Sequence, residues 1–302
     1  MSILRFPATK LGLMSVAALL GIVRIATPAA ERKCVEPTIY AGYVATEEQL
    51  SSAGLKVVSF NMAREERLDR ILRDLRKAQD LAGADVWLLQ EAVERSDSTR
   101  TIADLAHSLN LNYVFAPSDF FDDGKLASGL AVLSRYPILD PRVIPLRRHN
   151  LKFNHRCRIA LEVQIPGPAG PVRFYNVHLD TRITLKERIA QITPVLEQAS
   201  SLSGPSVVGG DLNTADVRWV WNVLPIPFAQ NHHDRIQHTF RDRGFASPLD
   251  GNRPTIDVLK LPLRLDWIFP RGFNSVSAGV TTIKFSDHNA VWVRLEPAEG
   301  QD

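Results

Sequence analysis

The sequence has little of several things that would mark a specialised chain. Its 302 residues include only two cysteines and three methionines, and the net charge at neutral pH is only +3. Two cysteines can form one disulfide at most. A small positive charge is compatible with an anionic substrate, but alone it does not indicate nucleic-acid binding. Hydrophobic residues make up 45% and charged residues 23% of the chain, which is typical of a soluble globular protein.

No apolar run approaches the roughly 20 residues that a membrane-spanning helix needs. The longest candidate, Leu11 to Val23, follows the basic residues Arg5 and Lys10 and stops at Arg24, with small residues after it. This order is typical of a secretory signal peptide. We therefore expect residues 1–30 to be a signal peptide or an N-terminal anchor. The protein would then be exported (secreted or periplasmic) or membrane-anchored.

The two cysteines, Cys34 and Cys157, have no acid–base pattern that would mark a nucleophile. Cys34 lies in a polar stretch and Cys157 in a basic one, so we expect them to be unlinked.

One catalytic domain is predicted over residues 55–297, because no break in composition divides this span. Residues 31–54 are expected to be a linker or irregular entry segment, and 298–302 a tail. Short β-branched runs alternate with a few amphipathic segments, which favours a layered α/β domain. Helices are expected near 68–81, 101–109 and 185–200, and Pro194 should kink or restart the last of them.

Short polar motifs follow the apolar, strand-like runs one after another. Acids and imidazoles are not needed at the ends of apolar strands, so their repetition points to an assembled site. The motifs are Ser59-Phe60-Asn61, Leu89-Gln90-Glu91, Asn176-Val177-His178, Gly210-Asp211-Leu212-Asn213, Leu265-Asp266-Trp267 and Ser286-Asp287-His288, with a basic stretch around Arg156 and Arg158.

These side chains suit metal-assisted cleavage of a phosphodiester. A hard divalent cation takes oxygen ligands such as carboxylates, and an attacking water must be oriented and deprotonated. Glu91 is a good candidate ligand. Asp211 and Asn213 are two residues apart, so in extended geometry they would share a face, one as base and one as hydrogen-bonding group.

Each motif has a plainer interpretation when it is taken alone. Gly-Asp-Leu-Asn has the composition of a simple turn, and Ser-Asp-His can cap a helix or loop. His178 after an apolar run is more often a partly buried histidine than a catalyst. The joint occurrence favours a site, because the plain interpretation would have to hold at every strand.

The ordered set of motifs resembles the endonuclease/exonuclease/phosphatase superfamily, which includes deoxyribonuclease I and neutral sphingomyelinases. The match covers about Lys56 to Leu295. The resemblance implies an α/β (α+β) fold, a four-layer sandwich of two mostly antiparallel β-sheets flanked by helices, and a site that uses Mg²⁺ or Mn²⁺. It also implies the following roles: Glu91, Asn61 and Asp287 at the metal; Asp211, His178, Asp266 and His288 in catalysis; and Asn213 at the phosphate.

Within that superfamily, a histidine at position 178 resembles the deoxyribonuclease I, sphingomyelinase and 5-phosphatase branches, whereas repair endonucleases tend to carry tyrosine there. The predicted function is a divalent-metal-dependent hydrolase, most simply an exported nuclease. The alternatives are a sphingomyelinase-type phospholipid phosphodiesterase or an inositol-phosphate phosphatase, and more remotely a non-catalytic binding module. That last alternative predicts lost acids, and the acids are present. No obligatory protein partner is indicated, and we expect a monomer.

Three further groups of residues are open to more than one interpretation. The basic stretch from Arg147 to Arg158 either lines the anion's approach, with Arg156 as the best substrate-binding candidate, or is a solvated loop. Phe120 and Phe121, expected in a polar loop, and Trp219 and Trp221 could stack on bases, enter a lipid interface or pack in the core. His232, His233 and His238 lack a zinc-ligand pattern and are expected on a surface loop.

Overall fold

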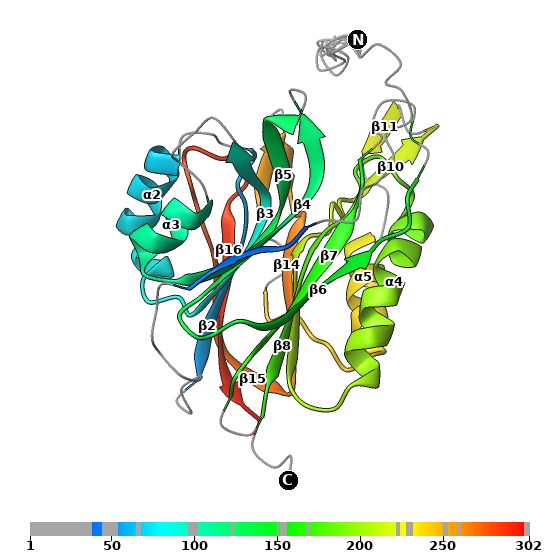
Figure 1. Ribbon diagram of the computed structural model, residues 1–302. Helices are drawn as coiled ribbons and strands as arrows, with labels where there is room; N and C mark the ends of the chain where they lie inside the picture. Colours follow the sequence, from blue (N-terminus) through cyan, green and yellow to red (C-terminus); the bar gives the residue numbers. More distant parts are fainter. Residues whose placement is uncertain are drawn as a thin grey trace, which may run out of the picture. The chain divides into compact units, whose positions relative to one another are not determined.

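The computed structural model describes most of the predicted catalytic domain (Figure 1). Residues 34–302 form one compact unit. The predicted leader, residues 1–30, and Cys34 lie outside the described residues, which are 38–43, 54–64, 68–95, 102–121, 124–149, 151, 156–167, 170–221, 224–227, 232–249, 253–258 and 261–298.

The larger sheet has seven strands in the order β1-β4-β5-β3-β2-β16-β15. All neighbours are antiparallel except β2 and β3, which are parallel and place Asn61 beside Gln90. In its central strands β2, β3 and β5, successive side chains point alternately to the inner core and to the outer helices, so these strands are apolar on both faces. The bounds are β1 Tyr40–Gly42, β2 Leu55–Asn61, β3 Val86–Arg95, β4 Asn112–Phe121, β5 Leu126–Ser134, β15 Phe273–Thr281 and β16 Ala290–Pro297.

The smaller sheet has five strands in the order β14-β9-β8-β7-β6. Here the parallel pair is β8 with β9, and the other neighbours are antiparallel. Each sheet thus has one parallel pair next to its polar motifs. The bounds are β6 Leu139–Pro145, β7 Ile159–Ile165, β8 Val172–His178, β9 Ser206–Asp211 and β14 Asp266–Arg271.

Helices cover the outer face of each sheet, which gives four layers (Figure 1), and three apolar cores hold these layers together. The inner core joins the two sheets, with Val132 of β5 and Phe174 of β8 both fully buried in it. A second core packs α2 (Leu68–Lys77) and α3 (Ile102–Leu109) on the larger sheet, and a third packs α4 (Leu185–Ser201) and α5 (His232–Arg241) on the smaller one. The predicted four-layer sandwich is confirmed.

A polar clamp ties the two sheets together inside the apolar inner core. The side-chain amide of Asn176 in β8 donates to the carbonyls of Leu89 in β3 (2.8 Å) and Ala131 in β5 (2.9 Å). Its Oδ1 accepts a hydrogen bond from Nε2 of Gln90 at 2.7 Å. A buried amide is costly unless its hydrogen bonds are made, so these contacts define one relative position of the sheets beneath the polar motifs.

The helices differ from expectation at two places. α4 runs through Pro194 as one element, and it begins with a capping box in which Thr184 and Glu187 each bond the other's backbone. The expected restart at Pro194 is therefore wrong. The segment with His232, His233 and His238 is not a surface loop but helix α5, because Ile236 and Phe240, four residues apart, are buried on one face. The 3₁₀ turn η1 (Gln79–Leu81) follows α2.

Several expected loops are strands. Tyr40–Gly42, within the predicted linker, pairs with β4 as an edge strand. Phe120 and Phe121 end β4 instead of lying in a loop. Two short hairpins also form: β10 (Val217–Val220) with β11 (Leu224–Pro227), and β12 (Ile256–Val258) with β13 (Leu261–Leu263).

The tryptophans of the first hairpin are not core residues. Trp219 on β10 is half-buried, and its ring centroid lies 5.5 Å from the guanidinium carbon of Arg182. Trp221, directly after β10, is 81% exposed. The core interpretation of this pair is therefore wrong.

Cys157 is disulfide-bonded, so the expectation of unlinked cysteines is wrong. Among the helices in the described part of the chain, none has the length and apolar character that crossing a membrane requires.

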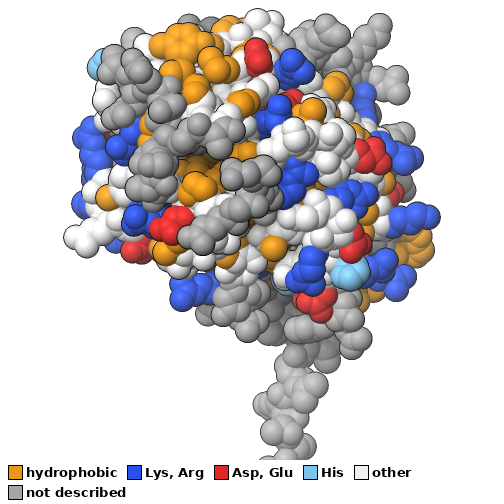
Figure 2. Space-filling model, turned by 90° about the horizontal axis from the view of Figure 1, so that it is seen from below, with side chains coloured by type: hydrophobic (Ala, Val, Ile, Leu, Met, Phe, Trp, Pro, Cys, Tyr) orange, Lys and Arg blue, Asp and Glu red, His pale blue; other side chains and the backbone are white. Residues whose placement is uncertain are grey.

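Figure 2 looks at the end of the sandwich away from the polar motifs, and basic side chains there are interspersed with acidic ones. This mixture agrees with the small net charge and does not form a field of one sign.

Candidate active site

The register of the smaller sheet brings three predicted site residues into one row. His178 at the end of β8 pairs with Asp211 of β9, and Asp211 pairs with Asp266 at the start of β14. Residues directly opposite one another on neighbouring strands point to the same face, so the imidazole and both carboxylates are presented together. All three side chains are buried, and Nε2 of His178 lies 3.5 Å from Oδ2 of Asp211.

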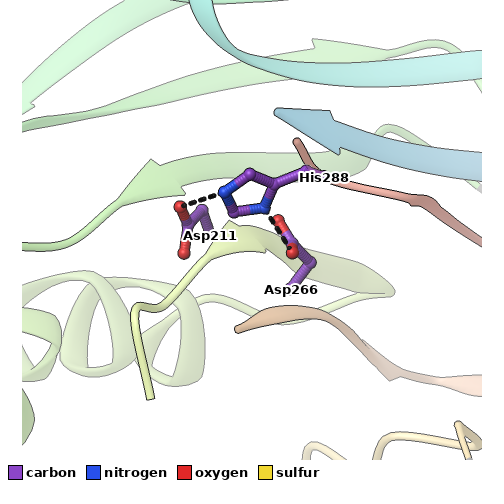
Figure 3. Close-up of side chains that lie close together, drawn as sticks. All are labelled: Asp211, Asp266 and His288. Carbon is purple, nitrogen blue, oxygen red and sulfur yellow. Dashed lines mark hydrogen bonds and ion pairs between the residues drawn. The ribbon is translucent and has the colours of Figure 1, made fainter. Parts of the chain in front are cut away.

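His288 reaches this row from the segment before β16. Its Nδ1 lies 2.8 Å from Oδ2 of Asp266, and its Nε2 lies 3.8 Å from Oδ2 of Asp211 (Figure 3). Ser286 holds the segment in place, because its hydroxyl donates to the carbonyl of Asn61 and accepts the backbone N–H of His288. The Ser-Asp-His motif thus joins the end of β2 in the larger sheet to the smaller sheet's acids.

Charge pairing governs the protonation of His288. Burial opposes a charged ring, but the Asp266 carboxylate, by its charge and its hydrogen bond, and then Asp211 raise the pKa of His288 to about 10. The ring is therefore an imidazolium at neutral pH, with Nδ1–H donated to Asp266 and Nε2–H directed toward Asp211.

Asp211 is held by both sheets. Asn61 Nδ2 donates to its Oδ2 at 3.0 Å, and the backbone N–H of Asn213 donates to its Oδ1 at 2.8 Å. Burial and then the Asp266 carboxylate raise the pKa of Asp211 to about 7, while His288 and these two hydrogen bonds act in the opposite direction. A carboxylate that titrates near neutral pH is suited to exchanging a proton with water.

Glu91 does not lie at a strand end, contrary to expectation. It sits inside β3 at a register shift between Leu89 and Ala92, with a left-handed φ of 50°. Such a bulge turns a side chain away from the regular alternation, and the unusual φ costs about 1–3 kcal/mol unless its surroundings compensate. The displaced carboxylate reaches the site: its Oε1 lies 4.0 Å from Nε2 of His178.

Two arginines approach Glu91, one on each oxygen. Arg64 Nε donates to Oε2 at 2.8 Å, and Arg156 Nη1 lies 3.5 Å from Oε1. Arg156 also lines a small pocket together with Glu91 and His178, so it belongs to the site and is not part of a solvated loop. Burial and the neighbouring charge of Arg158 lower the pKa of Arg156 below its usual range.

His178 lies among these charges as a neutral ring. Burial, followed by the positive charges of Arg158 and Arg156, holds the pKa of His178 well below its usual range. The two histidines of the site therefore differ in protonation at neutral pH. His288 is charged because its acid partner is close, and His178 is neutral because it is buried and cations lie near it.

The positions of Asn213 and Asp287 agree less well with the roles that the sequence predicts for them. Asn213 has a left-handed φ of 50°, so it does not share an extended face with Asp211, and its Nδ2 donates to the carbonyl of Leu179. The side chain of Asp287 is 65% exposed, and its Oδ1 lies 4.0 Å from Nε2 of His288. Both residues border the row of acids and histidines.

A buried polar network supports the segment after His178. The carboxylate of Asp180 accepts hydrogen bonds from Nε of Arg158 and from Nε2 of Gln191, both at 2.9 Å. The backbone carbonyl of Asp180 accepts a hydrogen bond from Arg188. These groups are almost fully buried, so the paired charges satisfy one another instead of water. Sequence reasoning missed Arg64, Asn176, Gln191 and Arg188 as contributors. Only Asn176 could have been found from the sequence, because it lies, like its partner Gln90, inside one of the recognised motifs.

The donor set fits a hard divalent cation. Carboxylate oxygens of Glu91 and Asp211 lie 4.0 Å and 3.5 Å from Nε2 of His178, Asn61 contacts Asp211 through its side-chain amide, and cationic groups already gather on the Glu91 carboxylate. Asp211, Asp266 and His288 also lie within 4.8 Å of one another, close enough to hold an ion. We favour the former group, because Nδ1 of the charged His288 ring is already occupied by Asp266.

A four-layer sandwich with acids and histidines gathered at one end of its two sheets defines the deoxyribonuclease I-like class of hydrolases. The chain belongs to the Endonuclease/Exonuclease/phosphatase family, whose model matches residues 58–288. Members of this family are divalent-metal-dependent hydrolases that act on phosphodiester bonds. The resemblance predicted from the motifs is therefore confirmed.

Solved structures agree in fold. An endonuclease/exonuclease/phosphatase from Beutenbergia cavernae has 21% identity and a TM-score of 0.65, covering 82% of this chain and 72% of that one. Humanized D. rerio TDP2 has 18% identity and a TM-score of 0.57, covering 82% and 100%. The human Nocturnin catalytic domain with bound sulfate has 18% identity and a TM-score of 0.53, covering 87% and 98%. No curated protein sequence matches this chain significantly.

Proposed function

We propose that this protein is a divalent-metal-dependent phosphodiesterase, an exported nuclease that acts on nucleic acid. The observation that carries the proposal is the convergence of Glu91, Asp211, His178 and His288 at one end of the sandwich. Bound there by Glu91 with Asn61, Mg²⁺ or Mn²⁺ would supply positive charge to the phosphate oxygens.

The chain's own side chains supply the remaining chemistry. Asp211, fixed by Asn61 and the backbone of Asn213, orients the attacking water and accepts its proton. His288 holds its Nε2–H toward the site because Asp266 occupies Nδ1, and it donates to the phosphoryl oxygens. Asp287 lies beside it and supports the metal or the phosphate from the exposed side.

His178 and the polar residues around it complete the proposed site. Its Nε2 lies between Glu91 and Asp211, where it contacts the phosphate or the leaving oxygen. Arg156 supplies a fixed positive charge next to it, and Asn213 holds the phosphate at the other side. We expect the site to act in a monomer, because the described residues of a single chain supply all of these groups.

One assay tests the proposed function. Purified protein with Mg²⁺ is incubated side by side with plasmid DNA, RNA, sphingomyelin and a phosphoinositide, and each reaction is repeated after chelation. We expect metal-dependent cleavage of a nucleic acid. Cleavage of none of the four substrates, with a folded protein, contradicts the proposal. The N-terminus of the native protein, read by mass spectrometry, tests export with removal of residues 1–30.

A sphingomyelinase-type phospholipid phosphodiesterase is the second candidate, and one observation favours it. The β10–β11 hairpin begins four residues after Asn213, and it carries Ile226, 44% exposed, with Trp221, 81% exposed, directly after β10. An exposed aromatic and aliphatic surface of this kind suits a lipid interface. Trp221→Ala should then lower cleavage of sphingomyelin in vesicles and leave a soluble phosphodiester unaffected. Equal loss on DNA would instead favour stacking on bases.

A further inference from the structure

Glu91, the proposed principal metal ligand, is shared between two guanidinium groups. Arg64 Nε donates to Oε2 at 2.8 Å, while Arg156 Nη1 lies at 3.5 Å from Oε1. A carboxylate has about four lone-pair positions, so the arginines leave some of them open. A divalent cation bound there would nevertheless stand close to two positive charges, which repel it.

The two arginines differ in how freely they can leave Glu91. The side chain of Arg64 is 41% exposed, whereas that of Arg156 is 23% exposed and lines the pocket beside His178. An exposed arginine can turn into solvent or toward a bound ligand at small cost, and a half-buried one cannot. Arg64 is therefore the movable member of the pair.

The backbone before Arg64 directs it to this position. Ala63 and Arg64 both have left-handed φ values, 52° and 54°, which are uncommon for residues other than glycine. The Oδ1 of Asn61 accepts the backbone N–H of Ala63 at 2.9 Å, while Nδ2 of the same side chain donates to Asp211. Asn61 thus links the turn that carries Arg64 to the acid of the site.

We propose that Arg64 is a substrate-binding residue that exchanges between two partners. It pairs with Glu91 in the resting protein, and it moves to an oxygen of the phosphodiester when a divalent cation takes Glu91. The cation and the phosphate then bind cooperatively, because the cation releases the guanidinium and the anion compensates its charge. This inference rests on the proposed function, since it takes Glu91 as a metal ligand.

Mn²⁺ binding tests the exchange without any turnover. Free Mn²⁺ is measured by electron paramagnetic resonance in titrations of the wild type, Arg64→Gln and Arg135→Gln. Arg135 is a matched control: its Nε lies 3.4 Å from Asp85, it is 38% exposed, and Asp85 is 14% exposed against 16% for Glu91. We expect Arg64→Gln to bind Mn²⁺ alone about three- to tenfold more tightly, and Arg135→Gln to bind it within about twofold of the wild type.

Inorganic phosphate supplies the second readout. It should tighten Mn²⁺ binding by the wild type and by Arg135→Gln, and this effect should be clearly smaller in Arg64→Gln. Arg64→Lys, which keeps the charge on a shorter and less directional group, should lie between the two. Unchanged or weaker Mn²⁺ binding by Arg64→Gln, or an undiminished effect of phosphate, overturns the inference.

Glu91→Gln separates this inference from the proposed function. If this variant binds Mn²⁺ as tightly as the wild type does, the proposed metal site itself is wrong. If it binds Mn²⁺ weakly while Arg64→Gln resembles the wild type, the metal site stands and only the exchange of Arg64 is wrong. Circular dichroism and urea unfolding of each variant confirm that the protein compared is folded.

Discussion

Oδ2 of Asp266 lies 2.8 Å from Nδ1 of His288, and this contact joins strand β14 to the segment that precedes β16. The backbone N–H of Asp266 donates to the hydroxyl of Thr255, and the backbone N–H of Asn289 donates to the carbonyl of the same threonine. One residue therefore holds both sides of the pair. Backbone hydrogen bonds to Thr255, together with the ion pair, therefore fix the orientation of the His288 ring.

Asp266→Asn should lower turnover much more than substrate binding. An amide supplies no negative charge to keep the His288 ring protonated and oriented, so kcat is expected to fall about 10²- to 10⁴-fold while KM changes little. Steady-state kinetics on the preferred substrate checks this, with Asp140→Asn on the exposed face of β6 as the control. Equal activity of Asp266→Asn and the wild type would count against the pair.

The same substitution changes how the stability of the metal-free protein depends on pH. Because the folded pKa of His288 is raised to about 10 from a usual 6.5, its contribution is complete below about pH 6.5 and is lost as pH rises toward 10. In Asp266→Asn this loss should shift to lower pH. Urea unfolding at a series of pH values, together with NMR titration of the ring, measures the shift. A His288 ring that titrates at the same pH in both proteins would be the contrary result.

Glu91→Ala should abolish metal-dependent hydrolysis. The variant loses a carboxylate that lies 4.0 Å from Nε2 of His178 and leaves Arg64 and Arg156 without their shared anion, so the local potential repels a cation. We expect activity to fall by at least about 10²-fold and Mn²⁺ binding to weaken. Glu197→Ala, at an exposed position of α4, controls for the loss of a carboxylate. Full metal-dependent activity in Glu91→Ala would remove Glu91 from the metal site.

Gly210→Ala should destabilise the fold next to the site. A Cβ there would lie 1.9 Å from the carbonyl oxygen of Val177, and φ is 145°, so β8 and β9 would have to separate between His178 and Asp211. The expected loss is about 3 kcal/mol or more of unfolding free energy. Gly204→Ala provides the comparison, because its φ is 90° but no atom lies within 4 Å, and it should cost about 1 kcal/mol. Urea denaturation decides, and similar losses in both variants would show that strand contact is not the cause.

Glu94→Gln should flatten the acid side of the stability profile. Chiefly by burial, the pKa of Glu94 is raised above its usual 4.5, although the backbone N–H of Ile102 donates to it at the start of α3. A raised carboxyl pKa favours the folded state below about pH 4.5, and this contribution is lost as pH rises through the folded value. The wild type should therefore lose stability relative to Glu94→Gln as pH rises from about 4.5 through the folded pKa of Glu94, as measured by urea unfolding. Parallel profiles would contradict it.

Local patterns carried much of the fold. The β-branched runs at Lys56–Phe60 and Asp85–Leu89 are recognisable as strands because apolar residues fill both faces, and α2 is recognisable from buried Leu68, Ile71 and Leu75. Short edge elements were missed. Tyr40–Gly42 has no strong pattern of its own and is a strand only because β4 offers it a partner. The β10–β11 hairpin was also missed, because its contacts are not local: Trp219 packs on Arg182, which is remote from it in the sequence.

The candidate site shows the same division. Asp211, Asp266, His178 and His288 are predictable because polar side chains after apolar runs are unusual, and their order carries a family signature. Arg64 is not predictable in this way. It lies in a run of charged residues, and its contact with Glu91 depends on two left-handed residues and on a bulge in another strand. Glu91 was found for its type but placed at the wrong point of its strand, since a bulge is a property of the strand pair.

The sequence alone determined the residue types, the order of the motifs and hence the family, because these depend on chemistry carried by single residues and on local periodicity. Only the tertiary structure decided that His178, Asp211 and Asp266 form one row, that His288 is charged while His178 is neutral, and that two arginines meet on Glu91. The reason is physical: register, burial and the distance between charges arise from contacts between segments remote in the chain, and the protonation of a buried group depends on those distances.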